Sequence, residues 1–331
     1  MKAPFPWFGG KSKVAPLIWD RFGDVRNYVE PFAGSLAVLL GRPSEPKIET
    51  VNDLDFWIAN FWRALQADPE VVAKHADWPV NEADLHARHL WLVRQTEFRE
   101  KMKTDPDYFD VKIAGWWVWG ISQWIGSGWC AERPIPLKRV RIGKTAGVNG
   151  ISYVSGISAG QGVHRSVNQK RPQLGGHGGF HGVHASALGG LYEWMFQLSC
   201  RLRRVRVCCG DWKRILGPAA TTCIGITGVL LDPPYAVEDR SDVYGEDSRD
   251  VACAVRQWAV ANGDNPDLRI ALCGYDTEHV MPASWTELAW KANGGFANQK
   301  SERTRGQENS NRERIWFSPH CLQPHQGFLF G

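Results

Sequence analysis

Short apolar runs that end in polar or turn-forming residues recur along this chain and constrain its fold more than any other feature. Each run has the length of a buried strand, and helical patterns such as Leu36 to Leu40 and Val251 to Val260 intervene. The runs lie at residues 27–29, 47–51, 205–209, 229–231, 268–272, 284–290 and 314–317. This alternation predicts an α/β fold with a doubly wound sheet that binds ligands beyond its strand carboxyl ends. The last two runs are expected to form a closing antiparallel pair.

The turn Asp232-Pro233-Pro234-Tyr235 directly follows the apolar run 229–231. Proline locks φ, lacks an N–H and forces its predecessor away from helix, so the chain leaves the strand stiffly. A carboxylate, an unpaired carbonyl and an aromatic ring are thereby presented together. They suit a flat molecule with an exocyclic amine, whose hydrogens Asp232 and the Pro233 carbonyl accept while Tyr235 lies on the ring face. A simple strand-end turn is the alternative.

A second candidate site begins at the segment from Glu30 to Ser35, which follows the first run. Ala33 and Gly34 allow close backbone approach, and a helix beginning near Ser35 offers free N–H groups to a carboxylate. Asp53 ends the second run, at the offset where an acid bonds ribose hydroxyls. These features predict a nucleoside ligand with an amino-acid-like carboxylate, which S-adenosylmethionine fits. Asp53 as a helix cap is the alternative.

The amino-terminal segment Trp7-Phe8-Gly9-Gly10-Lys11 places a glycine pair beside aromatic residues and a lysine. It can close over the same ligand, with Lys11 meeting the carboxylate and the aromatic rings covering the adenine or the sulfonium. A turn followed by a helix explains the same residues without a ligand.

In this order, the segments 7–11, 30–35, 52–53, 210–212 and 232–235 resemble the Dam-type (D12 class) DNA adenine-N6 methyltransferases, most closely those of bacteriophages and prophages. The resemblance extends to about Pro319. It implies a Rossmann-like methyltransferase sheet, S-adenosylmethionine as cofactor, a catalytic turn of Asp232, Pro233, Pro234 and Tyr235, and Asp211 facing the cofactor adenine. The residues expected to bind the cofactor are Trp7, Phe8, Gly10, Lys11, Glu30, Pro31, Phe32, Ala33, Gly34, Ser35, Asp53, Asp211, Trp212 and Asp232.

Residues 56–204 interrupt the strand pattern and are interpreted as an inserted target-recognition subdomain, leaving 1–55 and 205–331 as the catalytic domain. Helices are expected from Trp57 to Ala67, Glu70 to Ala76, Glu82 to Met102 and Tyr108 to Ile125. Between residues 126 and 190 the composition changes to Gly, Ser, His and Arg. A stretch this long without regular structure is expected to be functional or disordered, and we predict a mobile loop at about 143–190.

Basic charge is concentrated in this insertion. From Lys112 to Arg206 the chain has 13 Lys/Arg against two acids, whereas the remainder has 26 basic and 33 acidic residues. Such a block favours a polyanionic partner, although a solvated surface is the alternative. The residues predicted to contact DNA are Trp129, Arg133, Lys138, Arg139, Arg141, Lys144, Arg165, Lys170 and Arg171. Trp129 and its neighbouring tryptophans also fit core packing.

The sequence disfavours a metal site. His177, His181 and His184 have no accompanying acid or cysteine, so a polar loop is the better interpretation. Eight cysteines without a Cys-x-x-Cys pair predict neither a disulfide framework nor zinc. With 43% apolar residues and no run near the length of a membrane span, we expect a cytoplasmic protein of a bacterial or phage-infected host cell, as a monomer or weak homodimer.

We therefore predict transfer of a methyl group from S-adenosylmethionine to the N6 amine of a flipped-out adenine in double-stranded DNA. Three alternatives remain open at this point: an RNA adenine-N6 methyltransferase, a glutamine-N5 protein methyltransferase and a catalytically silent DNA-binding relative. The second usually has Asn in place of Asp232, and the basic insertion also argues against it.

Overall fold

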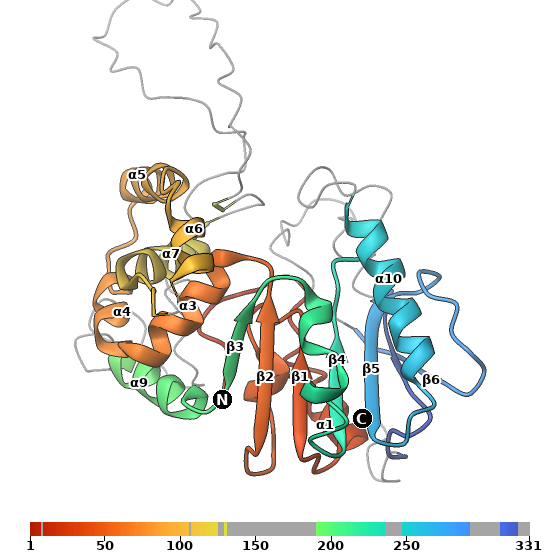
Figure 1. The fold of residues 1–331 in the computed structure, drawn as a ribbon. Helices are drawn as coiled ribbons and strands as arrows, with labels where there is room; N and C mark the ends of the chain where they lie inside the picture. Colours follow the sequence, from red (N-terminus) through yellow and green to blue (C-terminus); the bar gives the residue numbers. More distant parts are fainter. Residues whose placement is uncertain are drawn as a thin grey trace, which may run out of the picture.

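A computed structural model describes residues 1–7, 9–105, 107–124, 129–130, 190–235, 247–291 and 312–323 (Figure 1). In this described part, one sheet has the strand order β3-β2-β1-β4-β5-β7-β6. Its strands are β1 (Asn27–Glu30), β2 (Ile48–Asp53), β3 (Arg206–Cys209), β4 (Thr227–Leu231), β5 (Leu268–Tyr275), β6 (Thr286–Ala289) and β7 (Glu313–Phe317). Every strand predicted from the apolar runs is present, and the α/β class is confirmed.

The strand order places a topological switch point between β1 and β4. Strands β1 to β5 pair in parallel, and the chain builds β2 and β3 on one side of β1 but β4 and β5 on the other. Strand β7 runs antiparallel to both β5 and β6, which confirms the expected closing pair. In open α/β sheets, ligands bind outside the carboxyl ends of the strands at such a switch point. Here those ends carry the segments after Glu30 and Leu231.

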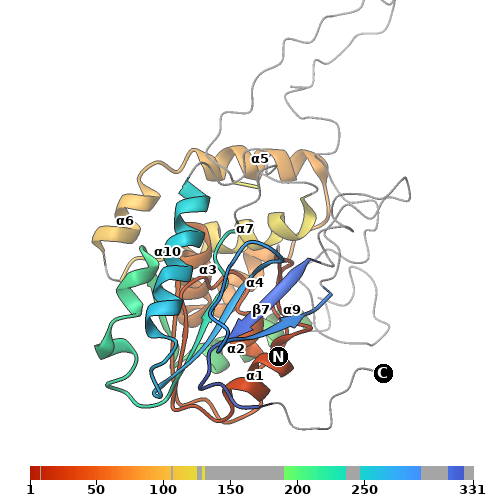
Figure 2. The same cartoon turned by 90° about the vertical axis from the view of Figure 1, so that its right-hand side faces the viewer.

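Helices cover both faces of the sheet because its strand side chains are apolar on both sides (Figures 1 and 2). Tyr28 and Leu230 belong to the larger of two cores, together with residues of α1 (Ala15–Phe22) and α2 (Ala37–Leu40). Val29 and Val229 belong to the other core, which is closed by α10 (Asp247–Asn262) and the 3-10 helix η2 (Trp212–Ile215). Successive strand residues thus face opposite layers, as the period of a β-strand requires.

The remaining helices come from the predicted insertion. They are α3 (Phe56–Ala67), α4 (Pro69–Ala76), α5 (Glu82–Val93), α6 (Phe98–Thr104), α7 (Val111–Gln123) and α9 (Gly190–Leu202). Side-chain oxygens cap four of them, where Asp55, Asp68, Asn81 and Asp110 accept N–H bonds from the first turn. Residues of α3, α4, α7 and α9 share the larger core with the sheet. The predicted boundaries between the catalytic domain and the insertion stay a prediction.

The prediction of a single helix from Glu82 to Met102 is wrong, because the helix is interrupted between α5 and α6. A turn forms at Arg94, where the N–H of Thr96 donates to the Arg94 carbonyl at 2.9 Å. The turn lets Phe98 stack on Trp57 of α3, with ring centroids 4.8 Å apart and planes 19° apart. Burial of this aromatic pair outweighs the continued hydrogen bonding of one long helix.

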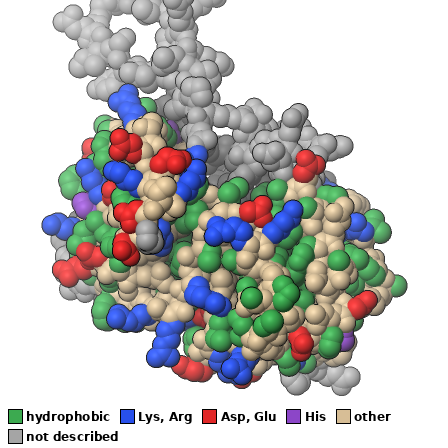
Figure 3. Space-filling model, in the orientation of Figure 1, with side chains coloured by type: hydrophobic (Ala, Val, Ile, Leu, Met, Phe, Trp, Pro, Cys, Tyr) green, Lys and Arg blue, Asp and Glu red, His purple; other side chains and the backbone are tan. Residues whose placement is uncertain are grey.

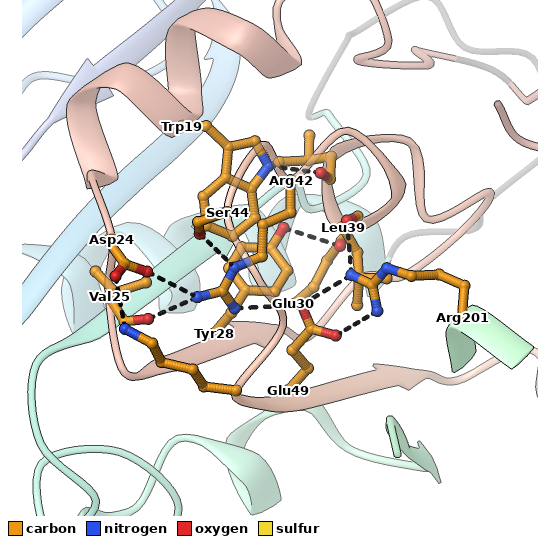
Figure 4. A network of polar contacts seen from close by, with 12 residues as sticks. Trp19, Asp24, Val25, Tyr28, Glu30, Leu39, Arg42, Ser44, Glu49 and Arg201 are labelled. Atoms are coloured by element: carbon orange, nitrogen blue, oxygen red, sulfur yellow. Dashed lines mark hydrogen bonds and ion pairs between the residues drawn. The ribbon is translucent and has the colours of Figure 1, made fainter. Parts of the chain in front are cut away.

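A buried ion-pair network fastens α9 to the sheet (Figure 4). Glu49 of β2 accepts from Nη1 and Nη2 of Arg201 at 2.7 and 2.9 Å, and from Nη1 of Arg42 at 3.2 Å. Arg201 also donates to the Leu39 carbonyl at 3.2 Å. The bidentate geometry orients the helix that returns the chain to β3. The network thus joins the far end of the insertion to the central strands.

Charged side chains of both signs are interspersed over the face of the molecule in Figure 3. All eight cysteines lie among the described residues and are free thiols. None of the described helices has the length and apolarity required to cross a membrane.

Candidate functional site

Asn52 ties together the loops that follow three neighbouring strands. Its side-chain Nδ2 donates to the Pro31 carbonyl at 3.1 Å and to the Gly210 carbonyl at 2.9 Å, and its own carbonyl accepts from the Ala33 N–H at 2.9 Å. The Gly210 N–H in turn donates to the Asp53 carbonyl at 3.1 Å. The segments that the sequence singled out after β1, β2 and β3 therefore meet at one edge of the sheet.

Gly34 is enclosed by two tryptophans and an aspartate. Its φ is +45°, and a Cβ at this position would lie 2.4 Å from Nε1 of Trp7, so only glycine fits. The Gly34 N–H donates to Oδ2 of Asp53 at 2.9 Å, and its carbonyl accepts from Nε1 of Trp62 at 3.1 Å. Trp7, Gly34 and Asp53 are thus brought together, and their predicted role in binding a common ligand stays a prediction.

Two details of this loop differ from expectation. The helix expected near Ser35 begins at Ala37 and has four residues, because Leu36 adopts the left-handed conformation. The N–H of Gly34 is occupied by Asp53 rather than presented to a ligand carboxylate. Asp53 also accepts from the Asp55 N–H at 2.9 Å, and burial raises the pKa of Asp53 despite these two bonds.

Lys11 joins the amino-terminal segment to the Asp-Pro-Pro-Tyr turn. Its Nζ lies 2.9 Å from Oδ1 of Asp232, 2.8 Å from the Tyr235 hydroxyl and 2.7 Å from the Gly9 carbonyl. An ammonium has three N–H donors, and all three are used. The Lys11 side chain is 4% exposed and turned to Asp232, and its predicted contact with a cofactor carboxylate stays a prediction.

The electrostatics of this pair keep the lysine charged. Burial alone would lower the pKa of Lys11, but the Asp232 carboxylate, Cys273 and Glu313 outweigh it and raise the pKa. Both bonds to the Asp232 carboxylate, from Lys11 and from the Tyr235 hydroxyl at 3.2 Å, go to Oδ1. The Asp232 side chain is also the more exposed member of the pair, at 23%. Among the described residues, none donates a bond to its second oxygen, Oδ2.

Tyr235 is more buried than the sequence predicted. Its ring packs edge-on against Tyr275, with centroids 4.6 Å apart, and only 5% of the residue is exposed. The hydroxyl bonds Glu313 at 2.8 Å, and burial, followed by the charge of Asp232, raises the pKa of Tyr235 well above its ordinary value. The buried ring differs from the open stacking face expected for an extruded base, so that role stays a prediction.

Glu313 is the residue that the sequence analysis missed. It is the first residue of β7 and pairs with Tyr275 of β5, which carries its carboxylate in behind the Asp232 turn. The only signal in the sequence was an acid that opens an otherwise mostly apolar strand. Nothing local indicates that its partners are Tyr235 and Lys11.

Glu30 lies inside the protein rather than toward a ligand. It accepts a bond from the Tyr28 hydroxyl at 2.9 Å, and both lie beside the buried network of Arg42 and Glu49 in Figure 4. Burial, with a contribution from Asp232, raises the pKa of Glu30 to about 8. Its predicted contact with the cofactor stays a prediction.

The residues after β3 divide between surface and core. Asp211 is exposed and caps η2 by accepting from the Lys213 N–H at 2.8 Å. Trp212 is buried, and its ring lies 6.2 Å from that of Phe32.

The loop after β1 contains Pro31, Ala33 and Ser35, of which Ala33 and Ser35 are buried. Gly10 and Lys11 lie in the described part of the amino-terminal segment, whereas Phe8 lies outside it.

Trp129 packs against α7. Its Nε1 donates to the Trp117 carbonyl at 3.1 Å, and its ring lies 5.3 Å from those of His89 and Trp124. Gly120 makes room for it, since a Cβ there would lie 1.8 Å from the Trp129 ring. This position agrees with core packing, and the predicted DNA contact of Trp129 stays a prediction. The remaining predicted DNA contacts, Arg133 to Arg171, and the three loop histidines lie outside the described residues.

Comparison with known proteins found one family match, which covers the amino-terminal third of the chain. Residues 7–110 match the model of the D12 class N6 adenine-specific DNA methyltransferase family. The matched region contains Lys11, Gly34 and Asp53, and the structure places Asp232, which lies beyond it, 2.9 Å from Lys11. A search of curated proteins found no match. The match therefore identifies residues 7–110 as a D12 class N6 adenine-specific DNA methyltransferase domain.

Proposed function

We propose that Asp232 and the Pro233 carbonyl hold the N6 amine of an adenine extruded from DNA while it receives a methyl group. The observation that carries this proposal is the Lys11–Asp232 pair at the carboxyl end of β4, beside the loop of Gly34 and Asp53. S-adenosylmethionine, when bound, supplies a methyl group on a sulfonium. The family match supports DNA adenine as the substrate, and the residue roles are our proposal.

The chemistry required of the protein follows from the amine. Its lone pair is conjugated into the ring, so it is a poor nucleophile until the nitrogen becomes tetrahedral. One Asp232 oxygen is fixed by Lys11, and the other oxygen with the Pro233 carbonyl can accept the two N–H bonds. Pro233 and Pro234 hold the turn rigid. Positioning and electrostatic stabilisation then supply most of the rate acceleration.

The residues at the strand ends fit the nucleoside part of S-adenosylmethionine. Gly34 has no room for a side chain beneath Trp7, so the backbone approaches this aromatic ring closely. The Asp53 carboxylate at the end of β2 suits the ribose hydroxyls, and the exposed Asp211 after β3 suits the adenine amine. Because Lys11 is fully bonded within the protein, the methionine carboxylate must be received by another group.

The target adenine has to leave the DNA duplex in order to reach Asp232. Helices α5, α6 and α10 extend beyond the carboxyl edge of the sheet (Figures 1 and 2). The N6 amine of a paired adenine is unreachable inside the stack, so the target base must leave the duplex to meet Asp232. The basic segment from Arg133 to Arg171, which lies outside the described residues, is proposed from its sequence to neutralise DNA phosphates, which would make binding salt-dependent.

The direct test is methyl transfer from labelled S-adenosylmethionine to DNA, comparing the native protein with Asp232→Ala. We expect N6-methyladenine with the native protein and a loss of at least about a hundredfold in the variant. Asp267→Ala, an exposed aspartate beside the opposite end of the sheet, is the matched control and should keep full activity. Equal transfer by Asp232→Ala would remove Asp232 from the mechanism. Preferential labelling of a competing RNA would favour the RNA alternative.

A further inference from the structure

A cluster of four polar groups lies behind the proposed transfer site. Lys11, Tyr235 and Glu313 are almost fully buried, and Asp232 is their partly exposed member. The Lys11 Nζ is 2.9 Å from Asp232 and 3.9 Å from Oε2 of Glu313. The rings of Tyr235 and Trp290 flank this ammonium, with centroids 5.2 and 5.7 Å from Nζ. The ammonium of Lys11 thus faces two carboxylates of the described residues in a largely buried site.

The hydrogen bonds of Tyr235 distinguish the two carboxylates. The phenol has one hydrogen, and it has two acceptors, Glu313 at 2.8 Å and Asp232 at 3.2 Å. Lys11 donates to the phenol oxygen, so the hydroxyl hydrogen is directed elsewhere, and Glu313 offers the shorter bond. When the Tyr235 hydroxyl donates its hydrogen to Glu313, it competes less with a substrate amine for the oxygens of Asp232.

The charges lead to the same division of roles. Lys11 and Asp232 alone would form a neutral pair. In such a pair, the positive charge of Lys11 would weaken the hydrogen bond that Asp232 accepts from a substrate amine. Glu313 adds a second carboxylate 3.9 Å from the lysine and offsets part of its charge at Asp232. A smaller positive field at Asp232 favours the positive charge that develops on the amine nitrogen during methylation, and buried charges act strongly because water does not screen them.

We propose that Glu313 is a positioning residue of the methyl-transfer site: it holds the Tyr235 hydroxyl and offsets Lys11, which keeps Asp232 available to the target amine. This inference rests on the proposed function of Asp232. Glu313 itself does not touch the substrate, and it acts through Tyr235 and Lys11. A merely structural ion pair would instead stabilise the end of β7 without affecting transfer.

Glu313→Gln is the sharpest variant, because it keeps the shape and an acceptor for Tyr235 while removing the charge. We expect kcat to fall about tenfold or more, with KM for cofactor and for DNA within about twofold of the native values. Glu287→Gln is the matched control, since Glu287 is an exposed carboxylate on the neighbouring strand β6 that bonds Arg314 and Trp316. Its kcat should equal that of the native protein.

A double-mutant cycle with Tyr235→Phe tests whether Glu313 acts through the hydroxyl. The losses in kcat of the two single variants should not add in the double variant, because both disturb one cluster. Additive losses would place Glu313 outside the path through Tyr235 and overturn that part of the inference.

The possible outcomes separate this inference from the proposed function. A native protein that transfers no methyl group to DNA would end the proposed function itself. A native protein that does, together with a Glu313→Gln variant of unchanged kcat, would overturn only the role of Glu313. A Glu313→Gln variant that fails to fold, or that changes KM alone, would assign the carboxylate a structural or binding role and also overturn the inference.

Discussion

Replacement of Glu30 by glutamine is expected to change how the stability of this protein depends on pH. Glu30 is buried and accepts a bond from the Tyr28 hydroxyl at 2.9 Å. Burial, with a further contribution from Asp232, raises its pKa from an ordinary value of 4.5 to about 8. Glutamine has nearly the same shape and an oxygen that accepts the same bond, but it cannot ionise.

The magnitude follows from proton linkage. Because the folded pKa lies above the unfolded one, the folded state binds more protons between pH 4.5 and 8, and the free energy of unfolding falls as pH rises through that window. Below pH 4.5 the carboxyl is protonated in both states and the effect vanishes. With these two pKa values, Glu30 alone lowers the free energy of unfolding by about 2 kcal/mol between pH 6 and pH 8.

Urea unfolding of the native protein and Glu30→Gln at pH 6, 7 and 8 measures this directly. The stability of the variant relative to the native protein should increase by about 2 kcal/mol from pH 6 to pH 8. Glu287→Gln, at an exposed carboxylate, should follow the native curve. Curves of native protein and Glu30→Gln that run parallel over this range would show that Glu30 is not held protonated, and would refute the reasoning.

Two further predictions concern packing and charge. Gly34→Ala should destabilise the protein by about 1–3 kcal/mol, because the new Cβ meets Trp7 at 2.4 Å with a φ of +45°. Gly217→Ala, where a Cβ meets nothing within 4 Å, is its control, and equal melting temperatures of the two variants would contradict the close packing. Glu49→Ala should cost about 3–5 kcal/mol, because it leaves the guanidinium groups of Arg42 and Arg201 without their shared carboxylate. Chemical unfolding measures this loss, and a change below about 1 kcal/mol would show that the pairs contribute little.

Much of the fold could be predicted from local patterns. The apolar runs predicted all the strands of the described sheet, because a strand buried on both faces needs a continuous apolar segment whatever its neighbours are. The turn from Asp232 to Tyr235 could be placed at a strand end for a similar reason, since proline restricts the backbone by its own ring. The family resemblance also rested on short segments, and the match over residues 7–110 agrees with it.

The helix break between α5 and α6 could not be predicted in the same way. The helical pattern from Glu82 to Met102 is continuous in the sequence, but the structure interrupts it before Phe98, whose ring stacks on Trp57. That contact joins residues far apart in the chain, so no local propensity reports it.

The proposed transfer site shows the same division most clearly. The sequence determined that a carboxylate, a proline turn and a lysine were present, because these are properties of the residues themselves. Only the tertiary structure decided that Lys11 pairs with Asp232, that Glu313 accepts a hydrogen bond from Tyr235 and that burial raises the pKa of Glu30. Ion pairing and desolvation depend on which groups meet and how much water is excluded, and strands distant in the sequence set both.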